Sequence, residues 1–202
     1  MTLKEINLKY NTDKEKHGYL TIYEDYFSKL QNHKLSILEI GIWSGESLKL
    51  WKEYFPNAEI IGIDNSDDCV RCQPLGTTSF LVDQADEKQL IKFSQDKLFD
   101  IIIDDGSHYS PHQILSFQVL FERLKPEGLY IVEDIHCSYK QKFGFRGERS
   151  INYFLKLAHY LNFRGKLQYV SEYEKNKSDF NGYDGRFKFI HFYPGLCIIK
   201  KR

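Results

Sequence analysis

Short apolar runs alternate with amphipathic segments along most of the chain. The apolar runs have the length of buried strands, and they lie at residues 36–41, 59–64, 78–82, 98–104 and 128–132. Apolar side chains recur at helical spacing in the segments between and after these runs, at about residues 45–55, 87–97, 111–124 and 150–163. Strands that alternate with helices of this length predict right-handed βαβ units, and therefore a mostly parallel sheet that helices cover on both faces.

The two ends of the chain differ from this regular alternation. Residues 1–30 form a polar, aromatic, helical segment, which we expect to act as an N-terminal helical lid. The tail has three further strand-like runs, at residues 167–173, 187–193 and 196–200. Pro194-Gly195 joins the last two as a hairpin. We therefore predict an α/β fold in one domain over residues 1–202, with a Rossmann-like, doubly wound, seven-stranded, mostly parallel sheet and a C-terminal antiparallel hairpin.

The composition is that of an ordinary globular protein. A chain of 202 residues is long enough for one domain with a substantial core, and 42% of its residues are hydrophobic. The 28 basic and 28 acidic side chains cancel, which excludes nucleic-acid binding driven by bulk positive charge. No stretch approaches the roughly 20 apolar residues of a membrane span, and residues 1–19 lack the apolar region of a secretory signal. We therefore expect a cytoplasmic protein without a membrane span or a nucleic-acid partner.

The four cysteines do not form a disulfide framework in a chain of this length and apolar content. Cys69 and Cys72 form a CxxC pair, which leaves a redox or metal site open as an alternative. No second pair and no two histidines follow nearby at the spacing of zinc ligands. The acidic residues before the pair and Gln73-Pro74 after it favour a turn of helix at the surface.

Glycines and an acidic residue follow the first two predicted strands, at the edge where open α/β sheets bind ligands. Gly41 and Gly45 allow a tight turn and close approach of a ligand to backbone N–H groups, and Ser47 follows in the first turn of the next helix. Asp64 ends the second strand, roughly 20 residues further on, where its carboxylate can accept hydrogen bonds from both hydroxyls of a ribose. The alternative is an ordinary strand-to-helix turn with acidic helix caps.

The turn departs from the G-x-G-x-x-G pattern of dinucleotide-binding proteins. It carries Glu39 inside the strand and lacks the third glycine, which disfavours NAD and favours S-adenosylmethionine (SAM), a ligand without a pyrophosphate. Asp83 and Gln84 follow the third strand, where a carboxylate and an amide can read the edge of an adenine. Together these residues predict a SAM site.

Four carboxylates converge at the ends of the fourth and fifth strands. Asp104 and Asp105 end the fourth strand, and Glu133 and Asp134 end the fifth. Neighbouring strands lie about 5 Å apart, and carboxylates this close cannot all stay ionised unless protonation, basic partners or a cation compensate them. Basic residues follow in the next loop, at Lys140, Lys142, Arg146 and Arg149. Because all-oxygen ligands suit a hard divalent ion such as Mg²⁺, we favour the bound cation.

Histidines lie next to these acids. His108 follows Asp105 by three residues, in a Gly-Ser turn. Imidazole titrates near neutrality, so it suits removal of a proton from a hydroxyl beside a metal ion. His112 follows at helical spacing, where it can pair with His108 or only cap a helix. His136 and Tyr139 follow the acidic pair of the fifth strand, where they can orient a substrate.

Four segments carry a specific resemblance to a known family. They read ILEIGIWSGESLKLW, FPNAEIIGID, FDIIIDDGSHYSPHQI and LYIVEDIHCSY. They are similar to class I SAM-dependent methyltransferases, and more narrowly to the metal-dependent sugar O-methyltransferases that act on macrolide and rhamnosyl groups, a family also described as cephalosporin hydroxylase-like. The resemblance covers about residues 10 to 140, and its most distinctive parts are Asp104–His108 and Glu133–Tyr139.

The resemblance implies a role for each of these residues. It implies that His108 is the general base and that the metal ligands are Asp105, Glu133 and Asp134. Asp104 would then face the cofactor or support the turn. The segment Thr12–Tyr19 resembles the family's TDK…HxY segment, which folds over the cofactor. The residues expected at the cofactor are therefore Glu39, Gly41, Gly45, Ser47, Asp64, Asp83, Gln84, Asp104, Lys14 and His17.

The sequence thus predicts a SAM- and Mg²⁺-dependent O-methyltransferase for a sugar hydroxyl, such as that of a rhamnose in a glycan or glycosylated product. Four alternatives stay open: a natural-product methyltransferase, a hydroxylase of the same family, an inactive nucleotide- or sugar-binding module, and a less favoured NAD-linked oxidoreductase. Macrolide-type relatives carry an extra N-terminal domain. Their oligomeric state and large substrates therefore do not transfer directly, and a homo-oligomer and a larger parent enzyme stay open as well.

Overall fold

The computed structural model describes residues 1–143, 147–162, 183 and 185–202, and in this part of the chain seven strands form one mixed sheet in the order β3-β2-β1-β4-β5-β7-β6. The strands are β1 Ser36–Ile40, β2 Glu59–Asp64, β3 Thr77–Leu81, β4 Phe99–Asp104, β5 Leu124–Val132, β6 Phe187–Tyr193 and β7 Leu196–Lys201. The first five are parallel, and β7 and β6 extend the sheet antiparallel beyond β5. The predicted Rossmann-like, doubly wound sheet with its C-terminal hairpin is confirmed.

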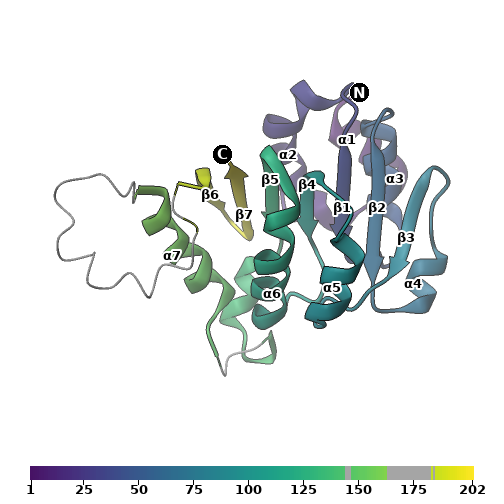
Figure 1. Cartoon of the computed structure of the whole chain (residues 1–202). Coiled ribbons are helices and arrows are strands. Elements are labelled where there is room, and N and C mark those ends of the chain that lie inside the picture. Colours follow the sequence, from purple (N-terminus) through teal and green to yellow (C-terminus); the bar gives the residue numbers. More distant parts are fainter. Residues whose placement is uncertain (144–146, 163–182, 184) are drawn as a thin grey trace, which may run out of the picture.

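Helices cover both faces of this sheet, and Figure 1 shows α5 and α6 in front of it and α1, α2 and α3 behind it. The helices of the front layer are α5 Glu87–Ser94, α6 Ser110–Leu120 and α7 Ser150–Asn162. Those of the back layer are α1 Leu3–Tyr10, α2 Tyr19–Phe27 and α3 Glu46–Tyr54. The short α4, Asp67–Arg71, contacts β2 and β3 at the edge and carries the CxxC pair as the expected surface turn.

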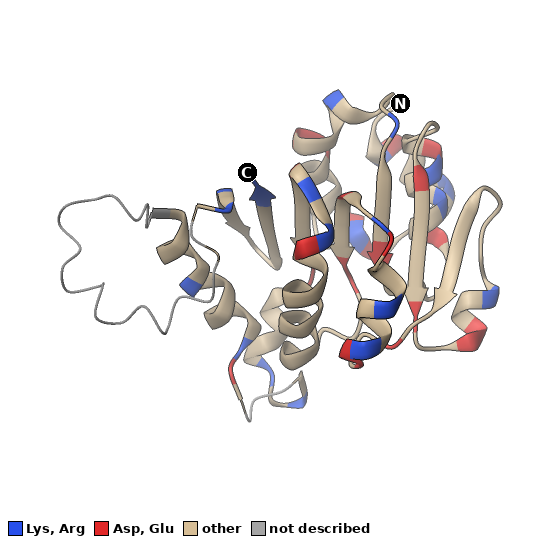
Figure 2. Ribbon diagram, viewed as in Figure 1, with Lys and Arg blue, Asp and Glu red and all other residues tan. Residues whose placement is uncertain are grey.

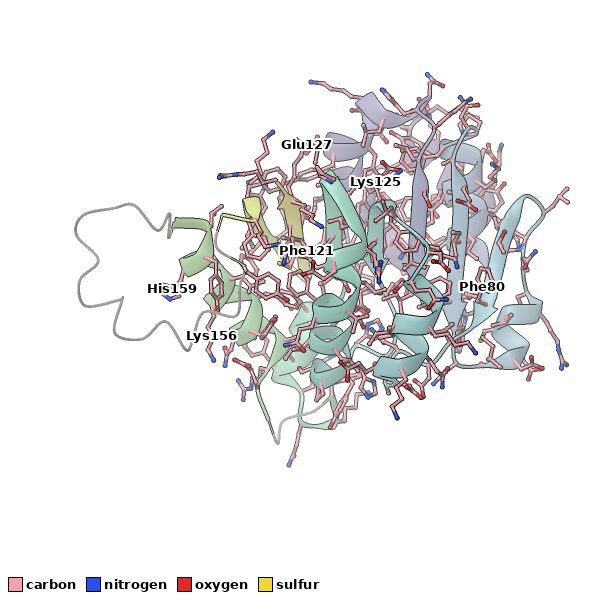
Figure 3. The ribbon with its side chains drawn as sticks, viewed as in Figure 1. Phe80, Phe121, Lys125, Glu127, Lys156 and His159 are labelled. Atoms are coloured by element: carbon pink, nitrogen blue, oxygen red, sulfur yellow. The ribbon has the colours of Figure 1, made fainter. Side chains whose placement is uncertain are left out.

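The amphipathic pattern decides which side of a helix faces the sheet. Phe154 and Leu157 of α7 are buried against the front of the sheet, whereas Lys156 and His159 point away from it (Figure 3). Phe121, just after α6, lies in the same core. Figure 2 shows positions of Lys and Arg interspersed with positions of Asp and Glu along most of the described ribbon.

Side-chain alternation along the central strands determines which carboxylates meet. Glu39 of β1 pairs with Ile103 of β4, so both side chains share the face that α1, α2 and α3 cover. Asp105 lies two residues after Ile103, and Glu133 occupies the equivalent position after β5, so both point to that same face. Asp104 lies between and points to the opposite face, toward α6.

The N-terminal segment packs as part of the core. Leu3 of α1 and Tyr19, Tyr23 and Phe27 of α2 are each at most 1% exposed, and they lie in one cluster with the side chains of α3. The helical character predicted for residues 1–30 is therefore confirmed. Its action as a lid stays a prediction, and such a movement would have to separate these buried side chains.

Two predicted helices were too long, and the one expected over residues 87–97 ends at Ser94. The helix expected over residues 111–124 ends at Leu120, a 3-10 turn follows over Phe121–Arg123, and Leu124 already begins β5. Pro126 explains the difference, because it disfavours helical backbone at Lys125 and has no N–H with which to continue a helix. The strand expected over residues 128–132 is correspondingly longer.

The C-terminal hairpin turns at Pro194-Gly195, as predicted, and Cys197 of β7 pairs with Val132 of β5. The strand expected over residues 167–173 lies outside the described residues. In the described part of the chain, no helix combines the length and the apolar character that crossing a membrane requires.

Candidate active site

A cavity of about 540 Å³ lies at the carboxyl ends of the parallel strands. The turns after β1, β2, β3 and β4 line it, together with residues 11–14 of the N-terminal segment. The predicted site residues in its lining are Lys14, Gly41, Ser47, Asp64, Asp83, Gln84, Asp105 and His108. Its size is that of an ordinary small-molecule or cofactor site, and its place is the one where open α/β sheets bind ligands.

The turn after β1 requires glycine and is held by Asp64. Gly41 has φ +95°, and a Cβ there would lie 2.3 Å from the carbonyl oxygen of Asp105. Asp64 accepts hydrogen bonds from the backbone N–H of Ile42 at 2.8 Å and, through its other oxygen, from that of Ser66 at 2.9 Å. Asp64 therefore fixes the turn as well as lining the cavity. Gly45 does not line the cavity and is the N-cap of α3.

Gln84 and Asp104 form a buried pair on the front face of the sheet. Gln84 Nε2 donates to Asp104 Oδ1 at 2.6 Å and to Ser116 Oγ at 2.9 Å, and Gln84 Oε1 accepts from the N–H of Ser107 at 3.0 Å. Asp104 is fully buried, and burial raises the pKa of its carboxyl to about 7. Asp104 does not line the cavity, so of its two expected roles this geometry supports the structural one.

Lys14 joins three strand-end carboxylates on the back face. Its ammonium lies 2.6 Å from Asp105 Oδ2, 2.7 Å from Glu133 Oε1 and 3.3 Å from Glu39 Oε1. Lys14, Glu39 and Glu133 are at most 2% exposed, and one oxygen from each of the three acids lies within 4.8 Å of the others. We call these four residues the inner cluster. The sequence predicted neither Lys14 as a partner of these acids nor Glu39 as a member of the group.

Burial and charge oppose each other in the inner cluster. Burial raises the pKa of Glu39 and, strongly, that of Glu133, and the neighbouring charge of Asp105 raises both further. Burial alone would lower the pKa of Lys14, but the three carboxylates raise it more, so its pKa lies well above the ordinary value. The ammonium is therefore a fixed positive charge, and it faces three acids.

Asp134 lies beside two histidines and outside the inner cluster. Its backbone is left-handed, with φ +52°, and its Oδ1 accepts a hydrogen bond of 2.7 Å from the Tyr19 hydroxyl. Asp134 Oδ2 lies 3.7 Å from Nε2 of His108, and Oδ1 lies 3.9 Å from Nδ1 of His136. Of the two histidines beside Asp134, His108 lines the cavity. Asp134 thus provides a negative charge next to it.

His17 and Tyr139 lie outside the cavity lining. His17 stacks on Tyr19, with ring centroids 5.3 Å apart, and its ring lies 6.4 Å from that of His136. Tyr139 is 62% exposed, and its ring lies 5.9 Å from the guanidinium of Arg149. The cofactor role of His17 and the substrate role of Tyr139 therefore stay predictions.

The expected metal ligands each keep one oxygen without a hydrogen bond. Side chains of residues 14–23 bond Asp105 Oδ2, Glu133 Oε1 and Asp134 Oδ1. We call the second oxygen of each acid its outer oxygen, and none of the three accepts a hydrogen bond from the described residues. Carboxylate oxygens without a cysteine among them suit Mg²⁺. Lys14 bonds the inner oxygens of Asp105 and Glu133, and the Tyr19 hydroxyl bonds that of Asp134. The chemistry of these carboxylates therefore fits a divalent ion, and their outer oxygens are the ones left for it.

The chain is similar in sequence to curated O-methyltransferases. No protein-family model matches it. It is 31% identical to 8-demethyl-8-α-L-rhamnosyl tetracenomycin-C 2'-O-methyltransferase from Streptomyces olivaceus, a match that covers 99% of this chain and 54% of that protein. It is also 31% identical to demethylmacrocin O-methyltransferase from Streptomyces fradiae, over 98% of this chain and 53% of that protein.

A solved structure matches the whole fold. The MycE methyltransferase of the mycinamycin biosynthetic pathway, in complex with Mg and SAH, aligns with a TM-score of 0.87 and 28% identity over 100% of this chain and 54% of that one. The chain is thus homologous to class I sugar O-methyltransferases. It spans about half the length of the curated relatives that it matches.

This homology to sugar O-methyltransferases confirms the resemblance found in the sequence, while the roles of the single residues stay predictions. Sequence reasoning missed three side chains of the site. Tyr19 and Tyr23 bond Asp134 and Glu133, and their spacing of four residues on α2 is a signal that could have paired them. Trp43 lines the cavity at 82% exposure, and no signal marks it beyond its place between the two glycines.

Proposed function

We propose that the chain is a SAM- and divalent-metal-dependent O-methyltransferase acting on a sugar hydroxyl, such as that of rhamnose or another deoxyhexose in a glycan or glycosylated product. One observation carries the proposal. His108 lines the cavity beside the strand-end carboxylates, with its Nε2 3.7 Å from the Asp134 carboxylate. The acceptor is supported by relatives whose names specify a rhamnosyl tetracenomycin and demethylmacrocin.

The site divides into a cofactor side in the cavity and a metal side at its edge, where Asp105 lines the cavity and Glu133 and Asp134 lie outside its lining. The turn at Gly41, with Asp64 and Gln84, would hold SAM, and the outer oxygens of Asp105, Glu133 and Asp134 would hold the divalent ion. When bound, SAM supplies a methyl group on a positively charged sulfur, and the ion supplies a Lewis acid beside the acceptor hydroxyl. The turn positions the donor for direct transfer, which places much of the catalytic work in orientation.

His108 is the general base in this proposal. Its Nδ1 is buried and Nε2 lies toward Asp134, so Nε2 is the nitrogen able to take the proton of the acceptor hydroxyl. The Asp134 carboxylate stabilises the imidazolium that forms. His136, on the other oxygen of Asp134, and Tyr139 would orient the sugar. The proposal includes a cytoplasmic setting and an acceptor other than nucleic acid.

Incubation of the chain with SAM, Mg²⁺ and a rhamnose-bearing acceptor, followed by mass spectrometry of the product, tests the proposal. We expect a gain of one methylene, its loss in EDTA and its return with excess Mg²⁺. A gain of one oxygen would instead identify a hydroxylase. SAM binding in a calorimeter without turnover on any sugar would identify a binding module, and full activity in EDTA would remove the metal from the mechanism.

A further inference from the structure

Lys14 occupies the point where the two buried acids of the inner cluster, Glu39 and Glu133, converge with the half-buried Asp105. We propose that Lys14 is a built-in counter-ion, which holds the inner oxygens of Asp105 and Glu133 and so restricts a divalent ion to their outer oxygens. The restriction of the ion to the outer oxygens rests on the proposed function, because it presupposes a divalent ion at the site. The counter-ion role of Lys14 concerns this chain alone.

The geometry of the ammonium matches its surroundings. Of its three N–H donors, the Lys14 ammonium uses two for hydrogen bonds to Asp105 Oδ2 at 2.6 Å and Glu133 Oε1 at 2.7 Å. Glu39 Oε1, 3.3 Å from Nζ, is a third carboxylate in ion-pair distance. The ring of Trp51, with its centroid 5.9 Å from Nζ, contributes a further favourable contact for a cation. Lys14, which is 1% exposed, therefore places its own positive charge among the carboxylates of the inner cluster.

The position of Lys14 is fixed by the fold. It lies in the 3-10 turn Asp13–Glu15, which directly follows the buried Thr12. Thr12 is in turn bonded to the buried Asn7 of α1. Asn7 Oδ1 accepts from both the backbone N–H and the hydroxyl of Thr12, at 2.9 and 2.7 Å. On the other side, the Tyr23 hydroxyl donates to Glu133 Oε1 at 2.5 Å, the same oxygen that Lys14 bonds.

The charges explain why a counter-ion is needed and why it leaves room for a metal. Glu39, Asp105 and Glu133 bring three acids to one ammonium, and Glu39 Oε1 is buried without a hydrogen-bond partner in the described structure. Without Lys14, the same three acids would offer one converging oxygen each, which is a divalent-ion site in its own right. With Lys14 in place, its single positive charge offsets one of the three carboxylates. Asp134 adds a further carboxylate beside the inner cluster.

A charge-balance cycle in EDTA tests the counter-ion role without any metal. We expect Lys14→Met to lower the Tm by roughly 10 °C, because it leaves buried acids unpaired. Glu39→Gln should leave the Tm unchanged or raise it, since Lys14 keeps two partners. The double variant should regain at least half of the loss. A purely steric role for the lysine predicts that the double variant has the same low Tm as Lys14→Met, and this result overturns the inference. A fall in the Tm of Glu39→Gln as large as that of Lys14→Met overturns it as well.

Mn²⁺ titration, followed by thermal unfolding, tests the effect on the metal. We expect Mn²⁺ to raise the Tm of Lys14→Met by more degrees than that of the wild type, and the addition of Glu39→Gln to reduce this gain. An equal or smaller gain in Lys14→Met overturns the restriction of the ion to the outer oxygens. If the wild type shows no response to Mn²⁺, the proposed metal site fails, and the cycle in EDTA decides the counter-ion role by itself.

Discussion

The side-chain amide of Gln84 donates a hydrogen bond of 2.6 Å to Asp104, and the second oxygen of this carboxylate is buried without a partner among the described residues. One hydrogen bond does not replace the hydration of a buried carboxylate, which is why burial raises the pKa of Asp104 to about 7. The fold therefore favours the protonated form of this side chain at pH values where an unfolded chain would release the proton.

This shift predicts a pH dependence of stability in the metal-free protein. Between about pH 4 and pH 7 the folded state holds a proton that the unfolded state has lost, so the free energy of unfolding falls as the pH rises through this window. A shift from 3.8 to about 7 corresponds to about 4 kcal/mol. Asp104→Asn should remove this slope and raise the stability above pH 7. Urea unfolding in EDTA at pH 5 and pH 8 measures both effects.

The matched control is Asp68→Asn, because the Asp68 side chain is 95% exposed on α4. It should leave both the stability and its pH slope as in the wild type. Equal slopes in the wild type and Asp104→Asn would show that Asp104 is ionised in the folded state throughout this range.

His108→Ala should lower kcat by roughly 10²- to 10⁴-fold, the range for loss of a general base, and leave SAM affinity nearly unchanged. The reason is that His108 lies on the acid side of the cavity, beside Asp134. His159→Ala, on the exposed side of α7 (Figure 3), is the control and should keep full activity. Wild-type turnover by His108→Ala from pH 6 to pH 9 would exclude it as the base.

Asp64→Ala should weaken SAM binding before it affects the chemical step. The variant loses a carboxylate that can accept hydrogen bonds from the ribose hydroxyls. The same carboxylate accepts a hydrogen bond from the Ile42 N–H, so its loss also loosens the turn at Gly41. Loss of charged hydrogen bonds of this kind predicts a rise in Kd of about 10- to 100-fold by calorimetry. Asp67→Ala, an exposed acid of α4, serves for comparison. A larger fall in kcat than rise in Kd would place Asp64 in the chemistry.

Gly41→Ala should destabilise the fold by about 2 kcal/mol or more, because a left-handed residue acquires a side chain. The added Cβ would also meet the Asp105 carbonyl oxygen at 2.3 Å, so the turns after β1 and β4 must separate. Gly147→Ala is the matched control, since its Cβ would have no neighbour within 4 Å. Denaturant unfolding of both variants measures the difference, and equal stabilities would show that the turn adapts.

The sequence allowed the sheet and its ligand edge to be predicted because both depend on local signals. Apolar runs that end in Gly41, Asp64 or Asp104 mark strands and their carboxyl ends without knowledge of any distant contact. The contact between Lys14 and Glu133 spans 119 residues and arises from the packing of the N-terminal segment on the back of the sheet, for which no local pattern exists.

Backbone conformation accounts for a second difference. The resemblance implies Asp105, Glu133 and Asp134 as metal ligands, and this set stays a prediction. The acids whose oxygens converge at Lys14 are Asp105, Glu133 and Glu39, and the sequence did not group Glu39 with the other two. Strand alternation selects Glu39, because it shares a face with Ile103. The left-handed backbone of Asp134, rare for residues other than glycine, turns that side chain to Tyr19.

The hairpin turn brings the end of the chain to this same place. The carbonyl oxygen of Gly195 accepts from the N–H of Ile135 at 3.0 Å and from the Tyr19 hydroxyl at 3.2 Å, so both termini contribute to the surroundings of Asp134. During synthesis on the ribosome, the turns after β1 to β4 have all emerged long before Gly195. The surroundings of Asp134 are therefore among the last parts of the site that a nascent chain can complete.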